Sequence, residues 1–146
     1  MRGGRLAAIA VVLAIAACAK SGREVILTKN APAPIGPYSQ AVRVGKALYV
    51  SGQLGVDPAT GQLVQGGVVA QAHQALKNLG AIIAEAGYTF DDVVQVQVFL
   101  EDMHDFGAVN GAYRAYFTSA LPARAAVEVG RLPMDAKIEI LAVASK

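Results

Sequence analysis

Two charged side chains stand in strand-like segments whose other residues are mostly small or apolar. Arg124 lies in the run Pro-Ala-Arg-Ala-Ala-Val-Glu-Val of residues 122–129, and Glu139 lies in Lys-Ile-Glu-Ile-Leu-Ala-Val of residues 137–143. A charge is costly to bury without a partner, so each side chain needs an ionic partner or a ligand. A free guanidinium can bind a carboxylate through two parallel hydrogen bonds, and a carboxylic acid can move protons to and from water.

The sequence leaves two interpretations of these charges open. In the first, they neutralise one another inside the protein, with Arg124 paired to Glu139 or Arg131 paired to Glu128. In the second, Arg124 forms an anion-binding fork beside the Glu139 carboxylate. The alanines that flank the arginine would then leave room for a small ligand.

Other common catalytic constellations are missing from the sequence. His73 and His104 have no metal-ligand partners at a useful spacing, and the single cysteine, Cys18, precedes the segment expected to fold. Ser51 stands in Val-Ser-Gly-Gln, without the surroundings of a nucleophile elbow, and no glycine-rich phosphate loop occurs. The sequence therefore predicts neither a metal nor a cofactor.

The N-terminal segment has the pattern of an export signal. Two arginines precede an uninterrupted apolar run that ends just before Cys18, and this run is too short to span a bilayer. We expect a signal peptide at residues 1–17, a lipobox at residues 15–18 with lipidation of Cys18, and a tether at residues 18–23. The resulting lipoprotein would lie at the periplasmic face of a bacterial membrane. An ordinary cleaved signal, which would release a soluble periplasmic protein, is the alternative.

The charge balance argues against a nucleic-acid partner. The formal charge of +2 falls to zero once residues 1–17 are removed, because eleven basic side chains then face eleven acidic ones. Nucleic-acid binders usually carry a clear basic excess. We therefore expect no nucleic-acid partner.

Hydrophobic periodicity predicts the elements that must position these residues. Apolar residues at spacings of three and four indicate a helix of about 19 residues that starts near Val68 and ends at Gly87, and a second helix spanning 106–117. Short strands are expected around 25–27, 41–44, 47–52, 94–100, 122–129 and 137–145. The order β-β-β-α-β-α-β-β favours one α+β domain at residues 24–146, with a mixed sheet and two helices packed on one face. Another subunit is then expected to cover the opposite face.

Several motifs give the chain a resemblance to the RidA enamine/imine deaminase family. Residues 122–140 resemble the C-terminal signature of that family. Four further segments agree in order: Ala-Pro-Ile-Gly-Pro-Tyr-Ser-Gln at 33–40, Leu-Tyr-Val-Ser-Gly-Gln at 48–53, Asp-Pro-Ala-Thr-Gly at 57–61 and Val-Asn-Gly-Ala-Tyr at 109–113. The resemblance covers about residues 26–144. It implies a chorismate-mutase-like fold and a homotrimer with ligand clefts between subunits.

The resemblance also implies an activity and a set of site residues. The family hydrolyses 2-aminoacrylate-type enamines and their imine tautomers to 2-oxo acids and ammonia, without a cofactor. Arg124 matches the carboxylate-binding arginine and Glu139 the acid that handles water. Four further positions match residues that line the cleft: Tyr38, Ser51, Gly52 and Asn110.

Two features depart from the family pattern. Many members have a cysteine where this chain has Ala126, and most lack an export signal. Export would place the protein away from most enzymes that generate 2-aminoacrylate, so a non-catalytic ligand-binding or scaffold trimer in the cell envelope is the alternative to a deaminase. An RNA-cleaving or translation-inhibiting role, attributed to some relatives, is disfavoured by the neutral charge and the export signal.

Overall fold

The structure is a computed structural model that describes residues 22–146. The predicted signal peptide (1–17), lipobox (15–18) and lipidation site Cys18, with most of the tether (18–23), lie outside the described residues and stay predictions. The described elements follow the predicted order. They are β1 (Arg23–Ile26), β2 (Ala41–Val44), β3 (Ala47–Leu54), α1 (Gly67–Glu85), β4 (Val93–Leu100), α2 (Phe106–Tyr113), β5 (Ala123–Glu128) and β6 (Ile138–Ser145), with 3₁₀ turns at Phe90–Asp92, Met103–Asp105 and Pro133–Asp135.

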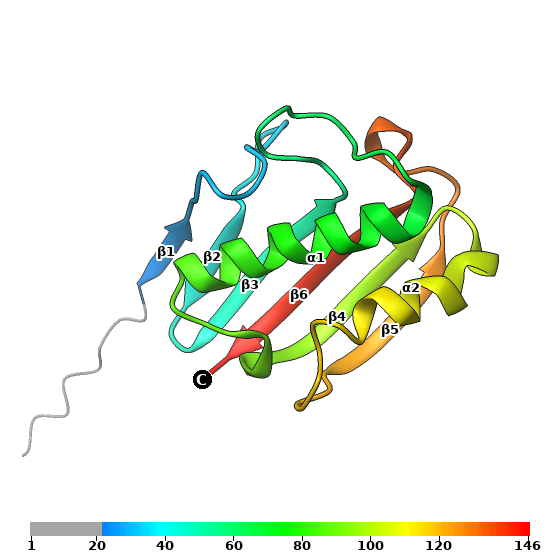
Figure 1. Cartoon of the computed structure of the whole chain (residues 1–146). Coiled ribbons are helices and arrows are strands. Elements are labelled where there is room, and N and C mark those ends of the chain that lie inside the picture. Colours follow the sequence, from blue (N-terminus) through cyan, green and yellow to red (C-terminus); the bar gives the residue numbers. More distant parts are fainter. Residues whose placement is uncertain (1–21) are drawn as a thin grey trace, which may run out of the picture.

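The strands form one mixed sheet in the order β1-β2-β3-β6-β4-β5. All neighbouring pairs are antiparallel except β4 and β5, which are parallel. A parallel pair needs a crossover connection, and α2 lies within the segment that provides it. Both helices lie on the same face of the sheet (Figure 1), which confirms the predicted α+β architecture.

The core lies between the helices and the sheet. Leu76, Leu79 and Ile83 of α1 are almost completely buried, as are Val96 of β4 and Ile140 of β6. Burial of such side chains contributes roughly 1.5–3 kcal/mol each. The 3.6-residue periodicity thus marked the buried face correctly over most of α1.

Two details of the helices differ from the sequence prediction. Val69 lies three residues before Ala72, at the apolar spacing of the helix, but Val69 is 40% exposed and Val68 is buried in its place. The second helix ends at Tyr113 and not near Phe117. Phe117 is nevertheless buried, because a turn after α2 lets its ring stack on Tyr113 with the centroids 4.3 Å apart.

Helix α1 ends where the glycine predicted it would. Gly87 has a φ of 80°, a left-handed conformation that glycine adopts without strain. Its N–H donates to the Ala84 carbonyl, and the N–H of Tyr88 donates to the Ile83 carbonyl. These two hydrogen bonds form a Schellman motif, which satisfies carbonyls that the helix leaves unpaired.

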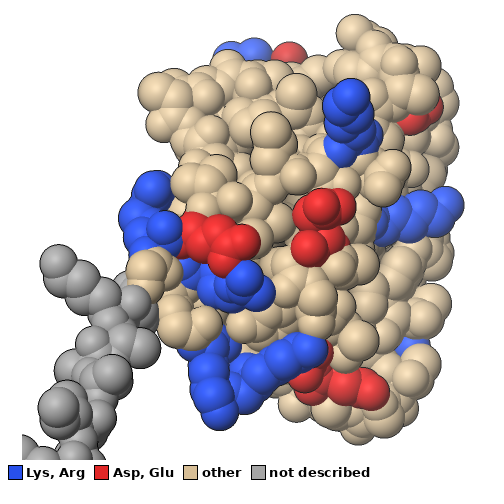
Figure 2. All heavy atoms as spheres, turned by 90° about the vertical axis from the view of Figure 1, so that its left-hand side faces the viewer, with Lys and Arg blue, Asp and Glu red and all other residues tan. Residues whose placement is uncertain are grey.

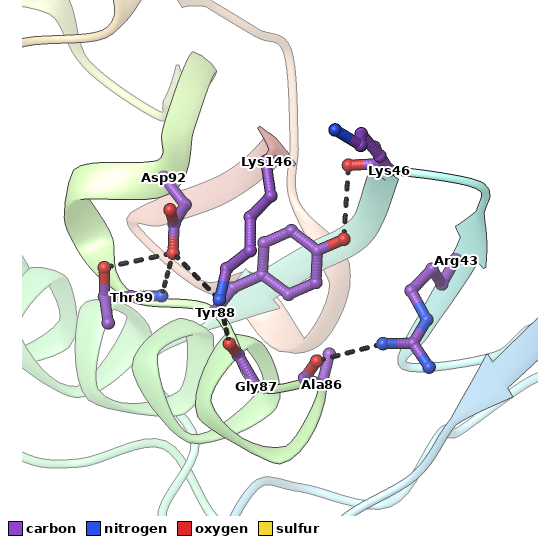
Figure 3. Close-up of polar contacts among 8 residues, drawn as sticks. All are labelled: Arg43, Lys46, Ala86, Gly87, Tyr88, Thr89, Asp92 and Lys146. Carbon is purple, nitrogen blue, oxygen red and sulfur yellow. Dashed lines mark hydrogen bonds and ion pairs between the residues drawn. The ribbon is translucent and has the colours of Figure 1, made fainter.

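Basic side chains from distant parts of the chain also contact this helix end (Figure 3). The Lys146 ammonium donates to the Gly87 carbonyl and lies 3.8 Å from the Asp92 carboxylate. Arg43 donates to the Ala86 carbonyl at 3.2 Å. Cations are favourable at the negative end of a helix dipole, so both contacts stabilise the end of α1. They also hold β2 and the residue that follows β6 against this helix.

The face of the sheet opposite the helices is uncovered in the single chain. Tyr49 and Val127 on this face are 54% and 44% exposed, and Phe99, Leu141 and Val143 are only partly buried. An apolar sheet face normally packs against another layer. The exposed surface therefore fits the expectation that a second subunit covers it.

Candidate active site

Arg124 projects from β5 toward α2, which holds it in place on three sides. Its Nη2 donates to Oδ1 of Asn110 at 2.7 Å. The guanidinium carbon lies 4.6 Å from the ring centroid of Tyr113 and 5.4 Å from that of Phe106. Stacking on aromatic faces and one side-chain hydrogen bond orient the planar group while leaving other N–H groups free to bind an anion.

The surroundings of Arg124 form an open pocket, here called the arginine pocket. Its volume is about 320 Å³, and its lining is Asn110, Tyr113, Arg114, Leu121, Pro122 and Arg124. Burial raises the pKa of Tyr113 to about 12 although the Arg124 cation opposes the shift. The Tyr113 hydroxyl is buried and has no hydrogen-bond partner among residues 22–146. Tyr113 therefore stays neutral and serves Arg124 through its ring.

Glu139 lies in a second pocket, here called the glutamate pocket. This pocket has a volume of about 270 Å³ and is lined by Ile35, Tyr38, Ser51, Gly52, Leu54, Pro133 and Glu139. Within the described part of the chain, no cation pairs with the Glu139 carboxylate. Partial burial raises the pKa of Glu139 above the ordinary 4.5. A carboxyl of this kind is suited to exchange protons with water.

Gly52 is required for the position of Glu139. A Cβ atom built on Gly52 would overlap the Glu139 carboxylate, at 2.6 Å from Cδ and 2.9 Å from Cγ. The missing side chain at Gly52 therefore makes the space in which the carboxylate lies. The resemblance to the RidA family implies that Gly52 lines the cleft, and the geometry supplies this physical reason.

Tyr38 and Ser51 are fixed by local hydrogen bonds. The Ser51 hydroxyl donates to the Ser39 carbonyl at 2.6 Å, so its proton already takes part in a hydrogen bond. The Tyr38 hydroxyl accepts a hydrogen bond from the Ile35 N–H at 3.2 Å. These contacts make Ser51 a positioning group of the pocket wall and leave no base to activate it as a nucleophile.

The proline-rich loop that carries Tyr38 is anchored by one buried side chain. The Gln40 amide donates to the carbonyls of Thr28, Ala31 and Pro32, and its oxygen accepts from the Thr28 N–H at 2.7 Å. Prolines remove the backbone donors that regular pairing would need. Gln40 therefore satisfies carbonyls of a loop that cannot join the sheet.

The two pockets lie on opposite faces of the sheet. Arg124 is in register with Val96, which is fully buried under the helices. Glu139 is in register with Phe99, and its neighbours Ile138 and Ile140 point into the core, so its own side chain points away from the helices. One chain therefore brings Asn110 to Arg124, and Tyr38, Ser51 and Gly52 to Glu139, but does not bring the two sets together.

Neither of the Arg–Glu bridges considered from the sequence forms in the described residues. Arg131 pairs with Asp135 at 2.7 Å, and Glu128 accepts a hydrogen bond from the backbone N–H of Met103. Sequence reasoning missed the aromatic support of Arg124 by Phe106 and Tyr113. Their spacing in the second helix indicates core packing and carries no signal of a contact with Arg124.

Among residues 22–146, no group of three or more His, Cys, Asp or Glu side chains is placed to hold a metal ion. No helix in the same range is long and apolar enough to cross a bilayer.

Comparison with known proteins gives consistent matches. The family described as Endoribonuclease L-PSP matches residues 28–146. A mouse protein named 2-iminobutanoate/2-iminopropanoate deaminase is 57% identical over 122 residues, which are 84% of this chain and 90% of the mouse protein. The crystal structure of RidA from an Antarctic Psychrobacter species is 44% identical, with a TM-score of 0.82 over 84% of this chain and 99% of that one. E. coli TdcF, crystallised with bound serine, is 39% identical, with a TM-score of 0.81 over 84% of this chain and 98% of that one.

Proposed function

Because the chain belongs to the Endoribonuclease L-PSP family, which takes in RidA, we propose that it hydrolyses 2-imino acids and their enamine tautomers to 2-oxo acids and ammonia. The similar mouse protein is named for deamination of two such imines. The observation that carries the proposal is an exposed, aromatic-supported Arg124 together with a half-buried Glu139 that has no ionic partner among the described residues.

The first step is substrate binding by Arg124. The guanidinium binds the substrate carboxylate through two charge-assisted hydrogen bonds, each contributing roughly 1.5–3 kcal/mol. The Asn110 contact holds the group in a fixed plane. Fixing the carboxylate places the adjacent imine carbon and converts a bimolecular encounter into a local reaction.

The second step is proton transfer by Glu139. The ionised carboxylate takes a proton from water as the water oxygen adds to the carbon of the protonated imine, which gives a neutral carbinolamine. Glu139 then gives this proton to the carbinolamine nitrogen. The carbon–nitrogen bond breaks while the carbinolamine hydroxyl gives up its proton, so the products are a 2-oxo acid and ammonium. The raised pKa of Glu139 suits a group that must both accept and return a proton.

The active site is proposed to form between subunits of a homotrimer. Arg124 and Glu139 face opposite sides of the sheet, so one substrate cannot contact both within a single chain. An oligomer that covers the open sheet face would place the glutamate pocket of one subunit against the neighbouring subunit. The arginine pocket of that neighbour would complete the site.

An imine-hydrolysis assay tests the function. An amino-acid oxidase generates 2-imino acids continuously, and semicarbazide traps whatever the protein does not hydrolyse. The full chain should lower semicarbazone formation, and Arg124→Ala should abolish the effect. Binding of a 2-oxo acid without any turnover would support the alternative, a ligand-binding or scaffold trimer.

The family description names ribonuclease activity, but the balance of charged side chains does not favour RNA binding. Residues 22–146 contain ten Lys and Arg against eleven Asp and Glu. Figure 2 shows the side near the start of the described chain, where basic and acidic side chains lie interspersed. A phosphate backbone is bound mainly through an excess of positive charge. Salt-sensitive RNA binding by the purified protein would reopen this possibility.

We also propose export and lipid attachment through Cys18. The support is the sequence alone: a basic start, a short apolar run and Ile-Ala-Ala-Cys at residues 15–18. Several acyl chains on one cysteine would hold the protein at a membrane. The protein should take up a labelled fatty acid in a bacterial host and fractionate with membranes, and Cys18→Ala should lose both. A soluble periplasmic product without label would support simple secretion.

A further inference from the structure

A third cavity, here called the side pocket, lies beside the glutamate pocket. Its volume is about 300 Å³. Four residues line both cavities: Ile35, Tyr38, Gly52 and Leu54. The side pocket and the space around the Glu139 carboxylate are therefore neighbours that share these walls.

The chemistry of this lining suits an aliphatic group. No charged residue lines the side pocket, and its walls include Pro34, Ile35, Leu54, Val56 and Met134. Two glutamines also reach it, but their amide nitrogens already donate to backbone carbonyls. Specific small-molecule sites have this character, with mostly apolar walls beside a few well-placed polar groups.

Met134 lines the side pocket from a strained turn. Met134 and Asp135 have φ angles of 61° and 57°, a left-handed conformation that costs a methionine more than it costs a glycine. The turn is held by the Arg131–Asp135 ion pair and by a hydrogen bond from the Asp135 N–H to the Leu132 carbonyl. It places Pro133 against the glutamate pocket and Met134 against the side pocket. One short turn thus borders both cavities.

We propose that the side pocket receives the side chain of the substrate and that Met134 limits the length it accepts. The preferred substrates are then 2-imino acids with unbranched aliphatic side chains. This inference rests on the proposed deaminase function. The substrate carbon next to Glu139 also bears the side chain, which enters the nearest apolar space. The flexible thioether side chain of Met134, itself 41% exposed, lets this wall adapt to chains of different length.

The expected effect follows from the burial of methylene groups. Each additional buried methylene should raise kcat/KM about fourfold until the pocket is filled. An imine with a butyl side chain should therefore exceed one with an ethyl side chain by about 15-fold.

The test measures kcat/KM for imines generated from alanine, 2-aminobutyrate, norvaline and norleucine. Met134→Trp, which fills the pocket, should flatten the rise with chain length. Met134→Gly, which relieves the positive φ and opens the wall, should extend the rise to longer chains. Met103→Gly is the matched control, because Met103 is similarly exposed and lines neither cavity. An identical length profile in all four proteins would overturn the proposal.

A binding experiment separates this proposal from the proposed function. Calorimetry with 2-oxobutanoate, 2-oxopentanoate and 2-oxohexanoate requires no turnover. Dissociation constants should fall about fourfold per methylene in the wild type and stay level in Met134→Trp. Length-dependent binding without imine hydrolysis would refute the deaminase function but support the proposed role of the side pocket. Imine hydrolysis with no dependence on chain length or on Met134 would refute the proposed role of the side pocket but support the deaminase function.

Discussion

Replacing Gly52 with alanine is expected to disable the site by moving Glu139. The added Cβ would lie 2.6 Å from Cδ of Glu139, a separation that carbon atoms do not tolerate. The carboxylate belongs to a flexible, half-buried side chain, so it should swing away while the backbone of β3 and β6 stays in place. The fold should therefore survive the substitution.

The size of the effect follows from this displacement. Relief of the overlap requires a shift of about 1 Å, and a misplacement of that size lowers an enzymatic rate by roughly 10²-fold. The predicted loss is therefore about 100-fold in kcat/KM on 2-iminobutanoate, measured by the semicarbazide competition assay. Gly130→Ala is the control, because a Cβ on Gly130 meets nothing within 4 Å.

A double mutant tests whether the loss runs through Glu139. If Gly52→Ala acts by displacing the carboxylate, combining it with Glu139→Gln should cost nothing beyond Glu139→Gln alone. Full activity in Gly52→Ala would refute the reasoning. So would multiplied losses in the double mutant, since they would mean that Gly52 acts independently of the acid.

Four further predictions concern the charges and the helix end. Arg124→Lys keeps the charge but loses the fork and one charge-assisted hydrogen bond, so kcat/KM should fall about 10- to 150-fold, while Arg43→Lys should leave it unchanged. The activity of the wild type should rise with pH along a limb centred above 4.5, since burial raises the pKa of Glu139 and only the ionised form takes a proton from water. The free energy of unfolding should change in the opposite direction, because the folded protein holds the Glu139 proton more tightly than the unfolded chain does. It should decline as pH rises from 4.5 through the raised pKa of Glu139, and Glu139→Gln should remove that decline. Gly87→Ala should lower the free energy of unfolding by about 1–2 kcal/mol in urea titrations without changing activity, because alanine is strained at a φ of 80°.

Local signals were sufficient to predict the elements of this fold. The change from alternating apolar residues to spacings of three and four located α1, and Gly87 marked its end. The α2 boundary was less predictable, since Phe117 is buried by a turn and keeps the apolar spacing of a helix beyond Tyr113.

The site was predictable only in part, because its geometry depends on tertiary structure. Small neighbours and a strand context singled out Arg124 and Glu139, but the sheet order that places them on opposite faces is not visible in the residues. The stacking of Arg124 on Tyr113 depends on how α2 crosses β5. The strained turn at Met134 carries no glycine, so no local signal marks its positive φ.

The most direct test of a shared active site is complementation between two inactive variants. Arg124→Ala and Glu139→Gln chains are produced together in one cell and purified as mixed oligomers through different tags. If each site takes its arginine from one subunit and its glutamate from another, one of the three sites in every mixed trimer has both residues, so the purified mixed oligomers regain about one third of the wild-type activity. Mixed oligomers as inactive as either parent would contradict a site divided between subunits.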